Sequence, residues 1–319
     1  LLKKLKVKKG DVVTIYLPMI PEVIFAMLAC ARIGAIHSIV FSAFSEEALK
    51  SRIIDGKSKV LITANGHYRK GEEVYLLDKV KIAIEGTKLK KVIVIPRLAK
   101  RIPSDFINYK KEIRKESSEC KPEVMNSEDP LFILYTSGTT GKPKGIIHDT
   151  GGYLTQAYTT SKFNFNLHEN DLMWCTADVG WITGHTYSCY GPLSLGNTLL
   201  IYEGSPDYPN FGRWWEIIQD NKVNVFYTAP TAIRLFMKYG DKYVKKYNLD
   251  SLEILGTVGE PIDEDAWNWY FKNIGKSKLP IIDTWWQTET GANVINALPG
   301  VGPFIPSYAG KAFPGINMA

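Results

Sequence analysis

Apolar runs rich in Val and Ile alternate with amphipathic stretches along most of the chain, and this alternation constrains the fold more than any other feature. The runs are expected to be strands, and they lie at residues 12–18, 35–41, 59–64, 91–96, 131–136, 172–177, 197–203, 223–230, 252–260 and 280–286. Helical patterns stand between them, at residues 22–34, 46–56, 77–85, 153–162, 211–221, 231–240 and 263–275. Strands that are apolar on both faces are typical of parallel sheets covered by helices. The sequence therefore predicts a layered α/β fold with largely parallel sheets and helices on both faces.

The pattern breaks between Arg97 and Asp129, where the chain becomes polar and basic. This break predicts a first α/β subdomain at residues 1–128, incomplete at its N-terminus, and a second subdomain at residues 129–319. The basic residues in the break have no regular array of aromatic residues among them, and the whole chain carries a formal charge of only +6. We therefore expect a solvated surface segment here and no nucleic-acid partner.

The composition is that of a folded globular protein, with 45% hydrophobic and 23% charged residues. The longest apolar stretch, at 23–41, is interrupted by Arg32, Gly34 and His37, so a helix followed by a strand is expected there and no membrane partner. The 4 cysteines have no C-x-x-C spacing, and the 5 histidines have no zinc-ligand spacing. The sequence therefore predicts reduced thiols, a cytoplasmic location and no zinc site.

A glycine-rich loop at residues 135–145 directly follows the strand expected at 131–136 and reads Tyr-Thr-Ser-Gly-Thr-Thr-Gly-Lys-Pro-Lys-Gly. Glycines let backbone N–H groups close around an anion, while the hydroxyls add donors and the lysines add positive charge. Because Pro143 follows Lys142, the loop does not fit the P-loop NTPase motif. The residues predicted to bind phosphate are Thr136, Ser137, Gly138, Thr139, Thr140, Gly141, Lys142 and Lys144.

This loop closely resembles the phosphate-binding signature of the adenylate-forming superfamily, which contains acyl-CoA synthetases, luciferases and the adenylation domains of peptide synthetases. Four further stretches, at 174–187, 227–234, 254–261 and 283–291, resemble the AMP-forming acyl-CoA synthetases that use acetate. The resemblance runs from about Gly10 to the last residue. The chain lacks an initial Met, and the resemblance implies that the superfamily's small C-terminal catalytic domain would follow its last residue. We therefore expect it to be an N-terminal portion of a longer protein and inactive by itself.

The resemblance implies a nucleotide site at the ends of two strands. Adenine is expected beside Gly259, Glu260 and Pro261. Adenine and the α-phosphate are expected beside the segment formed by Asp283, Thr284, Trp285, Trp286, Gln287 and Thr288. Glu289 would hold Mg²⁺, since a carboxylate is a hard oxygen ligand, and the resemblance makes Glu289 and Thr183 the catalytic residues of this part of the chain.

The resemblance also implies two further subsites. The acyl pocket is expected at Ile182, Thr183, Val258 and Trp286, where the indole would shorten the pocket and favour acetate or propionate by exclusion. The residues implied in CoA binding are Arg69, Lys70, Gly71, Glu72, Thr183 and Asp207. Glu72 stands where Arg is expected and Asp207 where Asn is expected. Acids near phosphates weaken such a site unless basic residues compensate.

Together these residues imply an AMP-forming acetate–CoA ligase. ATP, acetate and CoA would give acetyl-CoA, AMP and diphosphate through acetyl-adenylate, with Mg²⁺ as the cofactor. A ligase for propionate or another short acid stays open as an alternative, as does a non-catalytic nucleotide-binding fragment. The sequence also leaves open whether the protein forms a homo-oligomer.

Overall fold

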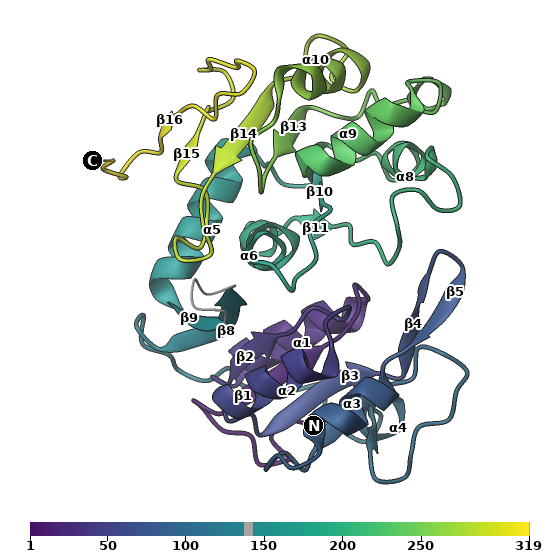
Figure 1. Cartoon of the computed structure of the whole chain (residues 1–319). Helices are drawn as coiled ribbons and strands as arrows, with labels where there is room; N and C mark the ends of the chain where they lie inside the picture. Colours follow the sequence, from purple (N-terminus) through teal and green to yellow (C-terminus); the bar gives the residue numbers. More distant parts are fainter. Residues whose placement is uncertain (137–142, 319) are drawn as a thin grey trace. The chain divides into compact units, whose positions relative to one another are not determined.

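The computed structural model describes residues 1–136 and 143–318. Backbone contacts divide the chain into two compact units, Leu1–Gly152 and Tyr153–Ala319. Figure 1 shows each unit as a sheet accompanied by helices. The first unit runs as far as Gly152 because the strands on both sides of the glycine-rich loop pair within its sheet. The subdomain boundary expected after residue 128 stays a prediction.

The first unit is built from the elements β1 (Val12–Tyr16), α1 (Pro21–Arg32), β2 (Ile36–Ile39), α2 (Glu46–Asp55), β3 (Val60–Ala64), β4 (Gly66–Arg69), β5 (Glu72–Tyr75), α3 (Leu77–Ile84), β6 (Val92–Ile95), β7 (Ile107–Asn108), α4 (Tyr109–Ile113), β8 (Pro130–Thr136) and β9 (Lys144–Asp149). Within the described residues its main sheet has the order β7-β6-β3-β1-β2-β8-β9, and all neighbours are parallel except β8 and β9. The connection from β1 to β2 and that from β2 to β3 run in opposite directions across the sheet. Since such crossovers are right-handed, α1 and α2 cover opposite faces.

Local sequence signals place two helices of the first unit. Pro21 occupies the first turn of α1, where its missing N–H costs no hydrogen bond. After the helix, Gly34 adopts the left-handed conformation with φ +67°. Ser45 caps α2 by accepting a hydrogen bond from the Ala48 N–H at 3.3 Å. The helices expected at 22–34 and 46–56 are thus found as α1 and α2, with ends that differ by no more than two residues.

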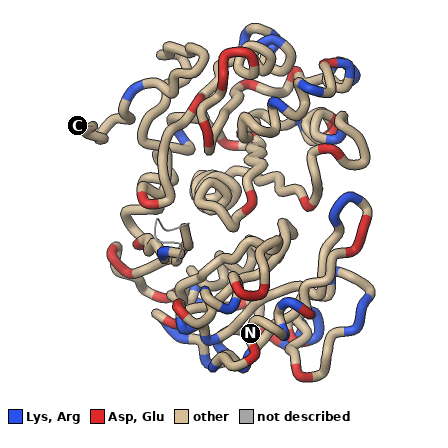
Figure 2. The backbone as a smooth tube through the Cα atoms, viewed as in Figure 1, with Lys and Arg blue, Asp and Glu red and all other residues tan. Residues whose placement is uncertain are grey.

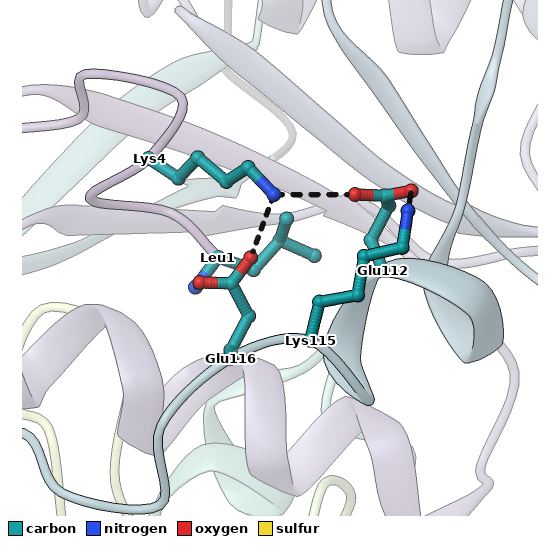
Figure 3. A network of polar contacts seen from close by, with 5 residues as sticks. All are labelled: Leu1, Lys4, Glu112, Lys115 and Glu116. Atoms are coloured by element: carbon teal, nitrogen blue, oxygen red, sulfur yellow. Dashed lines mark hydrogen bonds and ion pairs between the residues drawn. The ribbon is translucent and has the colours of Figure 1, made fainter.

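Ion pairs tie the N-terminal turns of the first unit to α4. The Lys4 ammonium lies 3.3 Å from a Glu112 oxygen and 3.2 Å from a Glu116 oxygen, and Lys115 reaches the other Glu112 oxygen at 2.6 Å (Figure 3). Glu112, Lys115 and Glu116 belong to the segment between Arg97 and Asp129 that was expected to be polar and basic. They are partly solvated, so each contributes little to stability.

The second unit contains α5 (Gly151–Asn164), which begins two residues before the boundary, and then β10 (Leu172–Cys175), α6 (Ile182–His185), the π-helical turn η1 (Thr186–Tyr190), α7 (Gly191–Ser194), β11 (Thr198–Leu199), α8 (Arg213–Asn221), β12 (Val225–Thr228), α9 (Pro230–Tyr239), the 3₁₀ turn η2 (Val244–Lys246), β13 (Ile254–Thr257), α10 (Glu264–Asn273), β14 (Ile281–Trp285), β15 (Ile295–Asn296) and β16 (Lys311–Ala312). Its described strands have the order β11-β10-β12-β13-β14-β15-β16. They are parallel up to β14 and antiparallel beyond it.

Both faces of this second sheet are buried. On β12, Phe226 packs with apolar residues of α8, α9 and α10, while its neighbours Val225 and Tyr227 pack with Phe165 and Tyr187 on the other face. This alternation is the period of two that a strand imposes on its side chains. The predicted α/β fold with largely parallel, helix-covered sheets is therefore confirmed. The helices and turn between residues 182 and 194 were missed, because that segment is apolar without a helical period.

Basic and acidic residues are interspersed along both units (Figure 2). In the part of the chain that the structure describes, no helix is long and apolar enough to cross a membrane. The 4 cysteines are free thiols, and Cys30, Cys175 and Cys189 are buried. Burial raises the pKa of the Cys175 thiol to about 11, so this thiol is protonated at neutral pH.

Candidate functional site

A cavity of about 970 Å³ lies in the second unit, at the carboxyl ends of its parallel strands. Each of four strands contributes the residues that follow it. Thr176 follows β10, Ala229 follows β12, Gly259 comes after β13 and Gln287 comes after β14, and all four border the cavity. Ligands of parallel α/β sheets bind at this edge, where the loops that follow the strands converge. The cavity is therefore the candidate ligand site of the second unit.

The four residues expected to form an acyl pocket all border this cavity. They are Ile182, Thr183, Val258 and Trp286. Ile182 is the first residue of α6 and Val258 directly follows β13, and the two residues are 8% and 7% exposed. Residues far apart in the sequence are thus brought to one wall by the ends of the strands.

Trp286 is packed against aromatic residues on the face of the sheet that lies opposite α8, α9 and α10. Its ring meets the Tyr187 ring edge to face, with centroids 5.5 Å apart and planes at 89°. Tyr187 meets the Tyr227 ring in the same way at 5.4 Å and 90°. Edge-to-face pairs add to the free energy of burying these rings. The indole is therefore a supported wall of the cavity.

The nucleotide segment expected after β13 lies at the rim of the cavity. Gly259 borders the cavity with φ +96°, and a Cβ built on it would meet no atom within 4 Å. Glu260 accepts a hydrogen bond from the Thr231 hydroxyl and pairs with the Arg234 guanidinium at 2.7 Å, while Pro261 is exposed. The turn therefore presents an open glycine face and is tied to α9 through Glu260.

The second nucleotide segment, expected at residues 283–288 around the end of β14, contains both buried and exposed residues. Asp283 is 7% exposed and accepts hydrogen bonds from the Thr257 hydroxyl at 2.7 Å and from the Thr284 N–H at 3.0 Å. Burial raises the pKa of Asp283, and these two donors oppose that rise. Trp285 is 46% exposed on strand β14. Of the expected residues in this segment, Trp286, Gln287 and Thr288 border the cavity.

Glu289 follows these residues in an exposed turn. Among the described residues, no group of three or more His, Cys, Asp or Glu side chains could hold a metal ion. A single exposed carboxylate still fits Mg²⁺, because this ion usually takes one or two protein carboxylates and completes its shell with phosphates and water. The donor set is thus compatible with a Mg²⁺ that arrives with a nucleotide.

The predicted phosphate loop belongs to the first unit. Ser137, Gly138, Thr139, Thr140, Gly141 and Lys142 lie outside the described residues. Thr136 ends β8 and Lys144 begins β9, and the two residues pair across this antiparallel strand pair. The predicted loop therefore connects the end of β8 to the start of the neighbouring strand β9.

The residues expected to bind CoA are divided between the units. Arg69, Lys70, Gly71 and Glu72 form the exposed tip of the β4–β5 hairpin, where Lys70 and Gly71 have φ +51° and +82°. Two further cations lie on the rings of this hairpin: Arg97 stacks on Tyr68 at 5.0 Å, and Lys100 on Tyr75 at 3.6 Å. The hairpin thus carries these two cations on its rings, and it also carries two acids, Glu72 and Glu73.

Asp207 and Thr183 lie in the second unit. The Asp207 carboxylate accepts a hydrogen bond from the Ser205 hydroxyl. Its neighbour Pro206 borders the cavity, as Thr183 does. Asp207 therefore lies next in sequence to a residue that borders the cavity, but does not border the cavity itself.

Sequence reasoning missed several residues of the cavity. Asp178 borders it and accepts a hydrogen bond from the Gly180 N–H at 2.7 Å, and burial raises the pKa of its carboxyl to about 6. Arg234, Lys238 and Tyr227 also border it. Asp178 lies four residues before the predicted acyl residue Ile182, and this nearness in the sequence could have indicated that Asp178 borders the cavity. The cations of α9 carried no such signal, because a lone Arg or Lys on a helix is usually solvated.

The fold and the cavity define the class of protein: an α/β protein with a cavity at the carboxyl ends of a parallel sheet, beside an aromatic wall. A family model described as AMP-binding enzyme matches residues 1–319, and the chain belongs to this family. The expected membership of the adenylate-forming acyl-CoA synthetases is thereby confirmed.

Named relatives are similar over nearly the whole chain. It is 56% identical to acetyl-coenzyme A synthetase of Wolinella succinogenes over 319 residues, which is 98% of this chain and 49% of that protein. It is 52% identical to the acetyl-coenzyme A synthetase of Helicobacter pylori strain HPAG1, with 98% and 48% covered. The solved structure of acetoacetyl-CoA synthetase from Streptomyces lividans superimposes with a TM-score of 0.85 at 25% identity, covering 94% of this chain and 46% of that one. The chain spans about half the length of these relatives.

Proposed function

We propose that the protein is an AMP-forming ligase that joins acetate to CoA with ATP. The observation that carries the proposal is the single cavity in which the predicted acyl residues meet the residues expected to hold the nucleotide. Ile182, Val258 and Trp286 supply apolar walls for a short acid, and Gly259 and Thr288 border the same space. Relatives that are 52% to 56% identical carry the name acetyl-coenzyme A synthetase, which supports acetate as the acid.

We assign ATP to three segments. The phosphates go to the loop from Thr136 to Lys144, the adenine to Gly259–Pro261, and the α-phosphate to Thr288. An open glycine face suits a flat base, since a backbone without Cβ allows close approach. Glu289 would hold Mg²⁺, which supplies charge neutralisation of the phosphates when bound.

In the first step, one acetate oxygen attacks the α-phosphorus of ATP. The bond from that phosphorus to its bridging oxygen breaks, and diphosphate leaves with the electron pair. The contribution of these residues is to position the acid and the α-phosphate and to exclude water from the anhydride. In the second step, the CoA thiolate attacks the acetyl carbon and AMP leaves. We assign the CoA nucleotide to the Arg69–Glu72 hairpin tip and the thiol end to Thr183.

A cytoplasmic location belongs to the same proposal, and the 4 free thiols support it. The direct test uses the full-length protein with ATP, Mg²⁺, CoA and acetate. We expect AMP, diphosphate and acetyl-CoA to form in equal amounts, with acetate used more efficiently than propionate and propionate more efficiently than butyrate. A ligase for propionate is the second candidate, and such an enzyme would use propionate more efficiently than acetate. Release of ADP and phosphate, or no acid-dependent use of ATP, would contradict the proposal.

A further inference from the structure

The turn at residues 287–291 lies between β14 and β15 and carries Thr288 and Glu289, which the proposed function assigns to the α-phosphate and to Mg²⁺. Glu289 is exposed, whereas Gly291 at the end of the turn is buried. The Gly291 N–H closes the turn by donating to the carbonyls of Gln287 and Thr288, each at 3.3 Å. These local bonds set the shape of the turn. Contacts with other parts of the second unit must set its place.

Thr186 provides such a contact. It is the first residue of the π-helical turn η1, is fully buried, and donates a hydrogen bond from its hydroxyl to the Gly291 carbonyl oxygen at 2.7 Å. The next residue, Tyr187, accepts a hydrogen bond from the Asn293 N–H at 3.2 Å and packs its ring on Trp286. Since Trp286 precedes the turn and Asn293 follows it, η1 holds the chain on both sides of the nucleotide turn.

The support for these contacts is closely packed. All five residues of η1 are buried, and the Gly191 N–H that follows them donates to the Thr186 carbonyl. A Cβ built on Gly191 would lie 2.8 Å from the Thr186 carbonyl oxygen and 3.0 Å from the Ala157 carbonyl oxygen on α5. The glycine therefore lets η1 pack against the backbone of α5. A π-helical turn is rare, and such turns are frequent at functional sites.

The direction of the hydrogen bonds shows how the Thr186 hydroxyl is oriented. This hydroxyl has one proton, which it donates to the Gly291 carbonyl oxygen. It also forms a buried 2.9 Å hydrogen bond with the Tyr153 hydroxyl on α5. Tyr153 must therefore be the donor in that bond. The Thr186 hydroxyl is thus held from α5 and aimed at the nucleotide turn.

We propose that Thr186 is a positioning residue, whose hydroxyl holds the 287–291 turn at a fixed place relative to the acyl wall. Helix α6, which supplies Ile182 and Thr183 to that wall, runs directly into η1. One helical segment therefore carries the acyl residues and anchors the turn expected to meet the α-phosphate. This inference rests on the proposed function and names a further residue of the same site. Thr186 does not border the cavity, so it acts through the turn.

The test is Thr186→Val in the full-length protein, which keeps the shape of the side chain and removes the hydroxyl. The Gly291 carbonyl then stays buried without this donor, which favours a shift of the turn. In acetate-dependent exchange of labelled diphosphate, we expect kcat/KM for ATP to fall about tenfold, which corresponds to about 1.4 kcal/mol. The Kd of ATP with Mg²⁺, measured by calorimetry, should rise by a similar factor.

The KM for acetate should stay unchanged in this variant, because the walls of the acyl pocket keep their packing. Thr186→Ser keeps the hydroxyl and should restore the wild-type values for ATP. A general loosening of the core would instead raise the KM for acetate together with that for ATP. Such a joint rise, an unchanged kcat/KM for ATP in Thr186→Val, or no recovery in Thr186→Ser would overturn the inference.

Ser188→Ala is the matched control, since it removes another buried hydroxyl from the same π-helical turn. The Ser188 hydroxyl donates to the carbonyls of Cys175 and Ala177, each at 3.2 Å, and so bonds to the end of β10 and the residues after it. Its loss should lower Tm and leave kcat/KM for ATP unchanged. An equal fall in kcat/KM for ATP would show that any buried hydroxyl of η1 has this effect, and would overturn the inference.

Two other outcomes are separable. If Thr186→Val does not fold, Tyr153→Phe removes the donor that orients the Thr186 hydroxyl and should lower kcat/KM for ATP by a smaller factor. No fall in that variant overturns the inference. If the wild-type protein binds ATP with Mg²⁺ but shows no acid-dependent exchange, the proposed function fails, and calorimetry still tests the anchor. A higher Kd in Thr186→Val then supports it, and an equal Kd overturns it.

Discussion

Under the proposed function, Trp286 is the residue on which the choice of acid depends most. In Trp286→Gly a slot opens between Ile182 and Val258, which border the same cavity. Each methylene buried there should gain about 0.8 kcal/mol, whereas beside the indole it must overpack a filled site at a cost of roughly 1 to 3 kcal/mol.

We therefore expect butyrate and valerate to overtake acetate in kcat/KM in this variant, and acetate itself to lose efficiency. Steady-state kinetics with four straight-chain acids measures this. If glycine and tryptophan give the same ranking of acids, residue 286 does not end the pocket.

Asp178 gives the cavity a pH-dependent residue. Burial raises its pKa from an ordinary value of 3.8 to about 6, so the folded protein holds this proton more tightly than the unfolded chain does. Stability from this carboxyl is therefore greatest at low pH and is lost as the pH rises from about 4 through about 6.

Asp178→Asn removes the charge and can still accept the Gly180 N–H. We expect it to be more stable than the wild type by roughly 2 to 3 kcal/mol at pH 7.5 and about equally stable at pH 4, because one pKa unit corresponds to about 1.4 kcal/mol. Urea unfolding at both pH values measures the difference. A constant gap between the two proteins at both pH values would be inconsistent with an Asp178 pKa near 6.

At the scale of elements, two side chains of α9 hold the turn between β13 and α10: the Thr231 hydroxyl donates a hydrogen bond to Glu260, and Arg234 forms two ion pairs. Arg234 reaches Glu260 at 2.7 Å with one nitrogen and Asp263 at 2.7 Å with another, and Asp263 also caps α10 through the Ala266 N–H at 2.9 Å. These ion pairs are partly exposed, so each is worth about 1 kcal/mol or less. Their effect should therefore fall on the position of the turn more than on stability.

Arg234→Gln should raise the KM for ATP about three- to tenfold while kcat and Tm change little. The matched control is Arg213→Gln, which breaks the 2.6 Å pair with Glu216 on α8. The control should leave the KM for ATP unchanged. Equal effects of the two substitutions would mean that the Arg234 pairs do not hold the nucleotide turn in place.

Gly256 on strand β13 lies against the Tyr227 ring of the neighbouring strand β12. Because a Cβ on Gly256 would lie 2.5 Å from the Tyr227 ring, Gly256→Ala should destabilise the second unit by about 1 to 3 kcal/mol. Gly56→Ala serves as control, since the nearest atom to its added Cβ is 3.1 Å away and its φ of −72° suits alanine. Denaturant unfolding compares the two. An equally small loss in both would show that Tyr227 adjusts without cost.

Element positions could be predicted from the sequence where a local signal marks them. The helix expected at 46–56 is α2, Glu46–Asp55, because Ser45 and the acids after it define its start. The strand expected at 197–203 shortens to Thr198–Leu199, since this edge strand has one neighbour and the chain after it turns toward the cavity rim. Short strands at sheet edges depend on packing that no local pattern records.

At the scale of the whole molecule, the predicted site residues after β13 and β14 follow neighbouring parallel strands, and this is why the sequence could place them together. The hydrogen bond between the Tyr227 and Thr284 hydroxyls could not be predicted, because it joins residues 57 apart and depends on a missing side chain on the strand between them. The cavity positions of Arg234 and Lys238 on α9 could not be predicted either. They depend on which acidic residues and which cavity these cations meet in the folded chain.

In the proposed function, the second unit's cavity holds a short acid against the α-phosphate of ATP. Acid-dependent exchange of labelled diphosphate into ATP, without CoA, tests this first step alone. With the full-length protein we expect exchange that requires acetate, falls from acetate to propionate to butyrate, and extends to longer acids in Trp286→Gly. Exchange that does not depend on a carboxylic acid, or that ignores the residue at position 286, would contradict the account.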